Sequence, residues 1–255
     1  MSQVVWVDSR SRISGSDSRF EIGLRESLHI REETRVRVDK CTFVDSFLTT
    51  DCGKYLYFAS PAGFSYVSVP EGAYTGPALA SAIQLATGRT TTFSLLTNSI
   101  VHTLASATQQ WLSDADLASR TGAFPPSASS TNPLSLNQIL GDGQNVGTTV
   151  TWSFVRMSPY TVLYLRSNML RCSDHHGPMG THNILCSIPL TRGVGSSVEA
   201  SSPDNVYYSL AGKSSIRTFD IELTDYMGRA VNLRGRQATC VAAHVRLTTL
   251  KNHNT

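Results

Sequence analysis

The strongest candidates for chemistry are the thiols and imidazoles between positions 172 and 186. This segment contains Cys172, His175, His176, His182 and Cys186. Imidazole nitrogen and thiolate sulfur are ligands that zinc prefers, and a closed tetrahedral site needs four of them. The segment nevertheless has no Cys-x-x-Cys pair and matches no standard zinc motif. A metal site is therefore only one of two interpretations of these residues.

The second interpretation is structural. Residues 175–182 are read as a polar hairpin loop between two predicted strands, Val162–Arg166 and Asn183–Ile188. Cys186 then lies in the second strand as a small core residue, because free cysteine is commonly buried. We favour this interpretation and predict no metal ligands and no cofactor.

Motifs of the common enzyme classes are absent from the rest of the sequence. There is no Gly-x-Ser-x-Gly elbow, no glycine-rich phosphate loop with lysine and no His-Glu-x-x-His pair. Asp220 and Glu222 fall on one strand face, as solvated carboxylates do on many sandwiches. Six tyrosines either form a carbohydrate-stacking surface or fill sheets, which is the more frequent role: Tyr55, Tyr57, Tyr66, Tyr74, Tyr207 and Tyr208. We predict no catalytic residues and no enzyme.

The elements that position these residues are predicted to be strands, because apolar residues recur with a period of two. The alternation is clearest in Phe20–Leu24, Val150–Phe154 and Phe219–Leu223. Further predicted strands are Val4–Asp8, Arg35–Val44, Tyr55–Ala59, Phe64–Val69, Val162–Arg166, Asn183–Ile188, Val206–Leu210 and Val241–Leu247. The predicted inward-facing residues are Phe20, Ile22, Leu24, Val36, Val38, Trp152, Phe154, Phe219, Ile221, Leu223, Val241 and Val245. Many short strands with few helices predict an all-β sandwich or barrel.

One short helix is predicted at about residues 75–87. Thr75 can cap it, Pro77 suits its first turn and Gly88 can end it. A weaker helical turn is expected at Ser135–Leu140. Because strands resume on both sides, we expect residues 89–148 to be an inserted excursion within a single domain spanning residues 1–255.

Composition and charge narrow the class of protein. The chain has 255 residues, of which 40% are hydrophobic and 16% charged, and no apolar run reaches the roughly 18 residues of a membrane helix. The five cysteines have no compact spacing, so we expect no disulfide framework. The first residues do not show the basic start and apolar segment of a signal peptide. We therefore expect a soluble chain made in the cytosol. The net charge is +3, but seven arginines fall in the first forty positions, interleaved with carboxylates. Weak contact with nucleic acid stays open as an alternative.

The N-terminal arm, residues 1–17, allows two interpretations. Val4–Val7 are apolar, whereas the residues that follow are polar and contain glycine. Such an apolar strand can pair with the sheet edge of a neighbouring subunit, which is the prediction made here. Alternatively, it is a strand of its own sandwich.

Several segments together resemble a known family. They are Val7–Arg12, the stretch Val69-Pro70-Glu71-Gly72-Ala73-Tyr74-Thr75 before the helix, the Leu-Gly turn of Leu136–Gly141, and the closing run Ile221–Leu233. The chain thus resembles the penton-type minor capsid proteins of Polinton-like viruses and virophages. The resemblance implies a jelly-roll fold and a homopentamer at the vertices of an icosahedral double-stranded DNA virus particle. It also implies packing against neighbouring major capsid proteins, which places the chain in the virion.

Three functions of different kinds follow from these observations. The first is a structural capsid protein of the vertex. The alternative is a β-sandwich spike that binds a receptor or a glycan. The third and weakest is a metal-dependent enzyme built on His175, His176 and His182.

Overall fold

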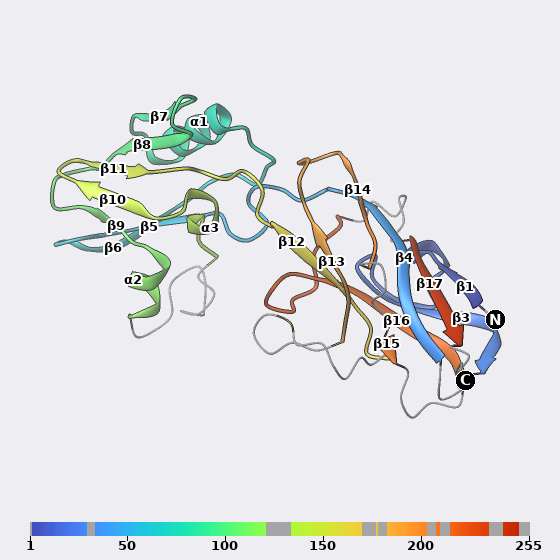
Figure 1. Cartoon of the computed structure of the whole chain (residues 1–255). Coiled ribbons are helices and arrows are strands. Elements are labelled where there is room, and N and C mark those ends of the chain that lie inside the picture. Colours follow the sequence, from blue (N-terminus) through green and yellow to red (C-terminus); the bar gives the residue numbers. More distant parts are fainter. Residues whose placement is uncertain are drawn as a thin grey trace, which may run out of the picture. The chain divides into compact units, whose positions relative to one another are not determined.

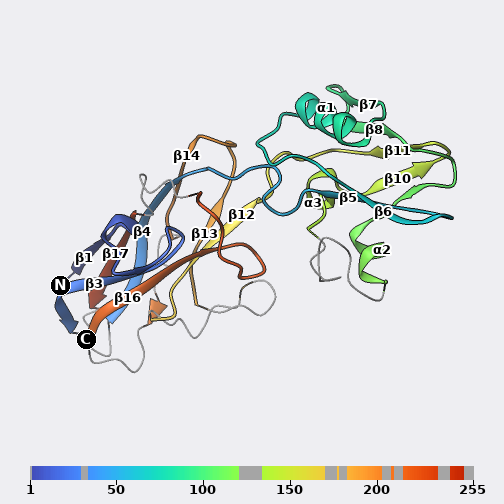
Figure 2. The same ribbon diagram turned by 180° about the vertical axis from the view of Figure 1, so that it is seen from behind.

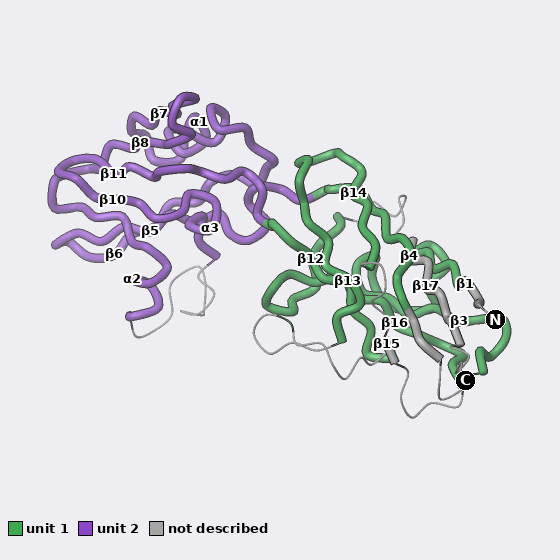
Figure 3. The backbone as a smooth tube through the Cα atoms, viewed as in Figure 1, with its two compact units in different colours: residues 1–46, 160–255 green, residues 47–159 purple. Residues whose placement is uncertain are grey.

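The computed structural model describes residues 2–29, 34–120, 134–169, 177, 183–202, 208–209, 215–234 and 242–249. The chain forms two compact units, which Figure 3 colours separately. Unit 1 comprises Met1–Ser46 and Tyr160–Thr255, and unit 2 comprises Phe47–Pro159. Strands dominate both units (Figures 1 and 2), so the predicted all-β fold class is confirmed.

Unit 1 contains two antiparallel sheets. The first has the order β1 (Ser2–Val7), β17 (Ala242–Thr249), β4 (Thr34–Val44) and β14 (Ser197–Ala200), with β15 (Tyr208–Ser209) also paired to β4. The second has the order β13 (Ile184–Pro189), β12 (Val162–Arg166), β16 (Ser215–Thr224), β3 (Arg19–His29) and β2 (Ser14–Gly15). A short 3₁₀ turn, η1 (Ser9–Ser11), lies between β1 and β2 along the chain.

The two sheets form a sandwich whose interior is filled from alternate strand positions. On β16 the side chains of Phe219, Ile221 and Leu223 are buried at alternate positions, which is the period of two expected for a strand with one buried face. Ile216 and Thr224 are also buried, and the register with β3 shifts between Ile216 and Thr218. The hydroxyl of Ser202 joins the sheets, because it accepts from the Val38 amide at 3.2 Å and donates to the Leu185 carbonyl at 3.0 Å. This arrangement confirms the predicted jelly-roll-like sandwich.

Most of the predicted core is buried. Seven of the predicted residues are inside: Phe20, Ile22, Val38, Trp152, Phe219, Ile221 and Leu223. Leu24 is half-buried, and the side chains of Val36, Val241 and Val245 lie outside the described ones.

The prediction was wrong for Phe154, which is 78% exposed. Strand β11 (Thr149–Trp152) ends two residues earlier, and Phe154 adopts a φ of 59°. A left-handed backbone ends the alternation on which the prediction depended.

Unit 2 combines two small antiparallel sheets with helices. One sheet has the order β10 (Gly143–Val146), β11, β8 (Ser99–Thr103) and β7 (Thr91–Ser94). The other has the order β6 (Gly63–Ser68), β5 (Tyr55–Ser60) and β9 (Gln110–Trp111). The helices are α1 (Gly76–Thr87), α2 (Asp114–Ala118) and α3 (Asn137–Leu140).

Both helical predictions in unit 2 are confirmed. Helix α1 starts after Thr75 and ends at Gly88, whose φ of 66° is the left-handed conformation that glycine adopts without strain. Helix α3 lies in the predicted turn. Among the described residues, no helix is long and apolar enough to cross a membrane.

The excursion expected at residues 89–148 lies inside unit 2, which begins earlier, at Phe47. It shares a sheet with the preceding segment, because Phe58 of β5 pairs with Trp111 of β9. The compact inserted body is therefore larger than the predicted excursion. That the whole chain forms a single domain stays a prediction.

The core of unit 2 is built around two tryptophans. The rings of Trp111 and Trp152 meet edge to face, with centroids 5.8 Å apart. His102 stacks on Trp152 at 6.1 Å, and its Nδ1 hydrogen-bonds the Thr91 hydroxyl at 2.8 Å. Burial lowers the pKa of His102 to about 4, so the imidazole is neutral and acts as a core residue.

The side chain of Asn145 joins the two sheets of unit 2. Its Oδ1 accepts from the Trp111 amide at 2.9 Å, and its Nδ2 donates to the Trp111 carbonyl at 3.1 Å. The carboxamide thus supplies the donor and acceptor that a neighbouring strand would supply. Strand β9 is connected to β10 in this way.

Candidate functional site

The two predicted strands that flank the segment with the cysteines and histidines pair with each other, as predicted. Strands β12 and β13 pair antiparallel, with Leu165 opposite Cys186. Cys172, His175, His176 and His182 lie outside the described residues.

Cys186 is only 2% exposed, and burial raises its pKa to about 11. The Cys41 thiol is also fully buried, and its pKa is raised by burial and by the nearby Cys186. Cys186 therefore has the environment of a core residue, as the structural interpretation predicted. The described part of the chain contains no group of three potential metal ligands, and the absence of a loop site stays a prediction.

The start of this hairpin connection is held by the carboxylate of Asp220 on β16. Oδ1 accepts from the Ser167 hydroxyl at 3.0 Å and from the Met169 amide at 2.8 Å. Oδ2 accepts from both the backbone amide and the side-chain amide of Asn168 at 3.0 Å. The pKa of Asp220 is lowered although burial alone would raise it, because these four donors stabilise the charged form. Asp220 is thus a structural anchor for the loop.

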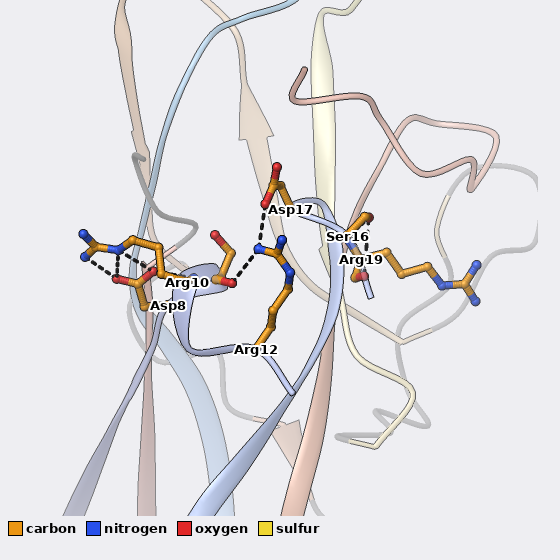
Figure 4. Close-up of polar contacts among 7 residues, drawn as sticks. Asp8, Arg10, Arg12, Ser16, Asp17 and Arg19 are labelled. Atoms are coloured by element: carbon orange, nitrogen blue, oxygen red, sulfur yellow. Dashed lines mark hydrogen bonds and ion pairs between the residues drawn. The ribbon is translucent and has the colours of Figure 1, made fainter. Parts of the chain in front are cut away.

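The arginine-rich N-terminal segment folds into a compact turn, shown in Figure 4. Asp8 caps η1 by accepting from the Arg10 amide at 2.9 Å, and it also pairs with the Arg10 guanidinium at 2.6 Å. Arg12 donates to the Ser9 carbonyl at 2.9 Å and to Asp17 at 2.7 Å. The side chains of Arg12 and Asp17 are 26% and 13% exposed, so this ion pair is largely shielded from solvent.

Arg19 extends away from this turn (Figure 4) and pairs with Glu222 of β16 at 3.4 Å. Three arginines of the segment therefore each have a carboxylate partner. Such pairing weakens the positive field that a phosphate backbone requires. Contact with nucleic acid stays an untested alternative, and these arginines give it no support.

Strand β1 corrects one prediction. It does not extend as a separate arm, because it pairs with β17 in its own sheet along its whole length, with Val5 opposite Val245. Val5 and Val7 are 8% and 1% exposed, so they contribute to the sandwich interior. The alternative interpretation, a strand of its own sandwich, is the correct one.

The opposite face of β1 is apolar and accessible. Val4 is 44% exposed and Trp6 is 72% exposed. We call these two side chains the β1 face. Because Val5 and Val7 point into the sandwich, this face lies on the outer surface of the sheet, at the end of the strand order that β1 occupies.

Three of the six tyrosines lie together on the β5–β6 hairpin. The rings of Tyr55 and Tyr66 meet edge to face with centroids 5.9 Å apart, and Tyr57 lies 6.3 Å from each. Tyr57 is fully buried, and burial raises its pKa to about 12, whereas Tyr66 is 43% exposed. Tyr74 instead donates to the Pro70 carbonyl at 2.7 Å. The side chains of Tyr207 and Tyr208 lie outside the described ones.

Two residues with defined structural roles, His102 and Asn145, are not predicted by the sequence patterns. His102 has a recognisable signal, because it occupies the inward position between Ile100 and Leu104, which are both buried. Asn145 has none, because its role depends on a strand that lies far away in the sequence.

No protein-family model and no curated protein matches the chain. Three chains of solved structures match it. One is the crystal structure of the mavirus penton protein, with 11% sequence identity and a TM-score of 0.49. The match covers 97% of this chain and 100% of the other.

Proposed function

We propose that the chain is a structural capsid protein that forms a homopentamer at the vertices of an icosahedral double-stranded DNA virus particle. The resemblance of the motifs at Val7–Arg12, Val69–Thr75 and Ile221–Leu233 to penton-type minor capsid proteins supports this function. In the proposed role the chain contacts its own copies and the neighbouring major capsid proteins, and it resides in the virion.

The β1 face is the observation that carries the proposal. Trp6 is 72% exposed and lies beside the half-exposed Val4, and tryptophan is a residue type that is enriched at contact surfaces. Its position on an edge strand suits lateral packing of one sandwich against the next. We assign this face to the contact between neighbouring subunits of the ring.

Light scattering of the full chain tests the proposal. The expected mass is five times 27.7 kDa. Trp6→Glu places a charge in the proposed contact and should convert the pentamer into monomers. The matched control is Leu96→Glu, which changes a side chain that is 96% exposed in the turn between β7 and β8 and should leave the pentamer intact.

Circular dichroism melting shows whether each variant is folded. A stable wild-type monomer or trimer would contradict the pentamer and would favour the alternative function, a spike that binds a receptor or glycan. A folded Trp6→Glu variant that remains pentameric would remove the β1 face from the contact.

A further inference from the structure

The sheet edges of unit 2 are not equally protected. Helix α1 packs along β7, where the Gln84 side chain accepts from the Thr91 amide at 3.1 Å. The Asn145 side chain connects the edges of β9 and β10. No described strand pairs with the outer edge of β6. Among the described strands of unit 2, this leaves β6 as the edge that can accept another strand.

The hydrogen bonds fix which backbone groups of β6 face outward. In the β5–β6 hairpin, Tyr57 is opposite Tyr66, and the Val69 amide donates to the Lys54 carbonyl at 2.9 Å. Antiparallel strands alternate between hydrogen-bonded and non-hydrogen-bonded pairs, so Val67 also bonds to β5. The amides and carbonyls of Tyr66 and Ser68 consequently point away from β5.

The composition of β6 leaves this edge open. Its sequence, Gly-Phe-Ser-Tyr-Val-Ser, contains no lysine, no acidic residue and no proline, and its six pairs with β5 show no bulge. Natural proteins usually block an exposed edge with one of these features. Ser65, Tyr66 and Ser68 are exposed, so a second strand can reach the edge.

We propose that β6 pairs antiparallel with β6 of a second copy about a two-fold axis at Tyr66. In this register Tyr66 lies opposite the same residue of the second copy, and Ser68 lies opposite Phe64. When a strand pairs with a copy of itself about a two-fold axis, a charged residue near the axis lies close to the same charge on the other copy, which destabilises the pair. Strand β6 contains no charged residue, so this repulsion does not arise. The pairing also extends the tyrosine cluster on β5 and β6 across the axis.

This contact is separate from the proposed pentamer. A two-fold contact buries the same patch on both copies and cannot close a ring of five. It therefore joins two chains or two rings, and it does not depend on the function proposed above.

Disulfide cross-linking of the full chain tests the register. Directly opposed residues of a hydrogen-bonded antiparallel pair have Cα atoms about 5.5 Å apart, which is within the range of a disulfide. Oxidised Tyr66→Cys should therefore give a covalent dimer on a non-reducing gel. The matched control is Val146→Cys, an exposed apolar position on β10, which should give no dimer beyond the wild-type background.

A second variant identifies the pairing itself. Ser68→Pro removes an amide that points away from β5, so the hairpin should survive while the contact loses a donor. Added to Tyr66→Cys, it should abolish the dimer without lowering the melting temperature substantially. No cross-link above the control, or one that persists in the folded double variant, would overturn the proposal.

Discussion

Replacing Asp220 with Asn removes the negative charge that holds the start of the β12–β13 connection. The carboxylate accepts four hydrogen bonds from Ser167, Asn168 and Met169. An asparagine amide keeps one acceptor oxygen. Its NH₂ group is itself a donor, so it cannot accept the hydrogen bonds that the second carboxylate oxygen accepted. Hydrogen bonds to charged groups contribute about 1.5–3 kcal/mol each, and leaving a partly buried donor unsatisfied costs about 1–3 kcal/mol. Because the site is only half-buried, we expect a total loss of about 2–3 kcal/mol.

The pH dependence of this loss follows from the sign of the pKa shift. The pKa of Asp220 is lower in the folded chain than its ordinary value of 3.8. Its contribution to stability is therefore fully present above that ordinary value and disappears as the pH falls through the lower folded value. The wild type and Asp220→Asn should differ in urea denaturation at pH 7, and the difference should shrink below about pH 4.

A matched control separates this anchor from a general charge effect. Glu222→Gln changes a carboxylate on the same face of β16 whose partner, Arg19, is 67% exposed. The Glu222 side chain itself is 13% exposed, but it has one partner, at 3.4 Å, whose guanidinium is solvated. A pair of this kind contributes about 0–1 kcal/mol, so this variant should lose less than Asp220→Asn. Equal losses for both variants, or an Asp220→Asn loss that is constant from pH 7 to pH 3, would refute the reasoning.

Three further predictions concern the core, the thiols and the loop. Ile221→Ala should lower the free energy of unfolding in urea by about 2–5 kcal/mol, whereas Phe154→Ala, at an exposed position, should change it by about 0.5 kcal/mol or less. Cys186 should resist alkylation at pH 8 in the folded chain and react after denaturation, as peptide mass spectrometry can measure, because burial raises its pKa to about 11. The double variant His175→Ala, His176→Ala should fold normally, and purified wild-type protein should contain no stoichiometric zinc; retained zinc together with unfolding of the variant would favour the metal interpretation.

The strands of the sandwich could be predicted because each has a long alternating segment. Phe219, Ile221 and Leu223 occupy three consecutive inward positions on β16, and all three are buried. The strands β7 and β10 have four residues each and only one large apolar residue each, Phe93 and Val146. A single apolar residue cannot show an alternation with a period of two. Helix α2 has a usable signal, the capping box of Ser113 and Asp116.

The candidate site was predictable only in part. The strand assignments around the loop indicated a hairpin, and the register of β12 with β13 confirms it. Sequence spacing alone could not decide between Cys186 as a ligand and Cys186 as a core residue. That choice depends on which strand face is covered, which the packing of the second sheet determines.

The start and the end of unit 2 lie close together, so the unit can be replaced as one segment. The unit is continuous in sequence, and the Cys52 thiol near its start lies 3.8 Å from the Pro159 carbonyl at its end. A segment whose ends meet can be shortened, lengthened or exchanged for another without moving the strands that flank it. A different insert whose ends lie equally close together could therefore replace residues 47–159 between Ser46 and Tyr160. Surface diversity can arise there while the sandwich stays constant.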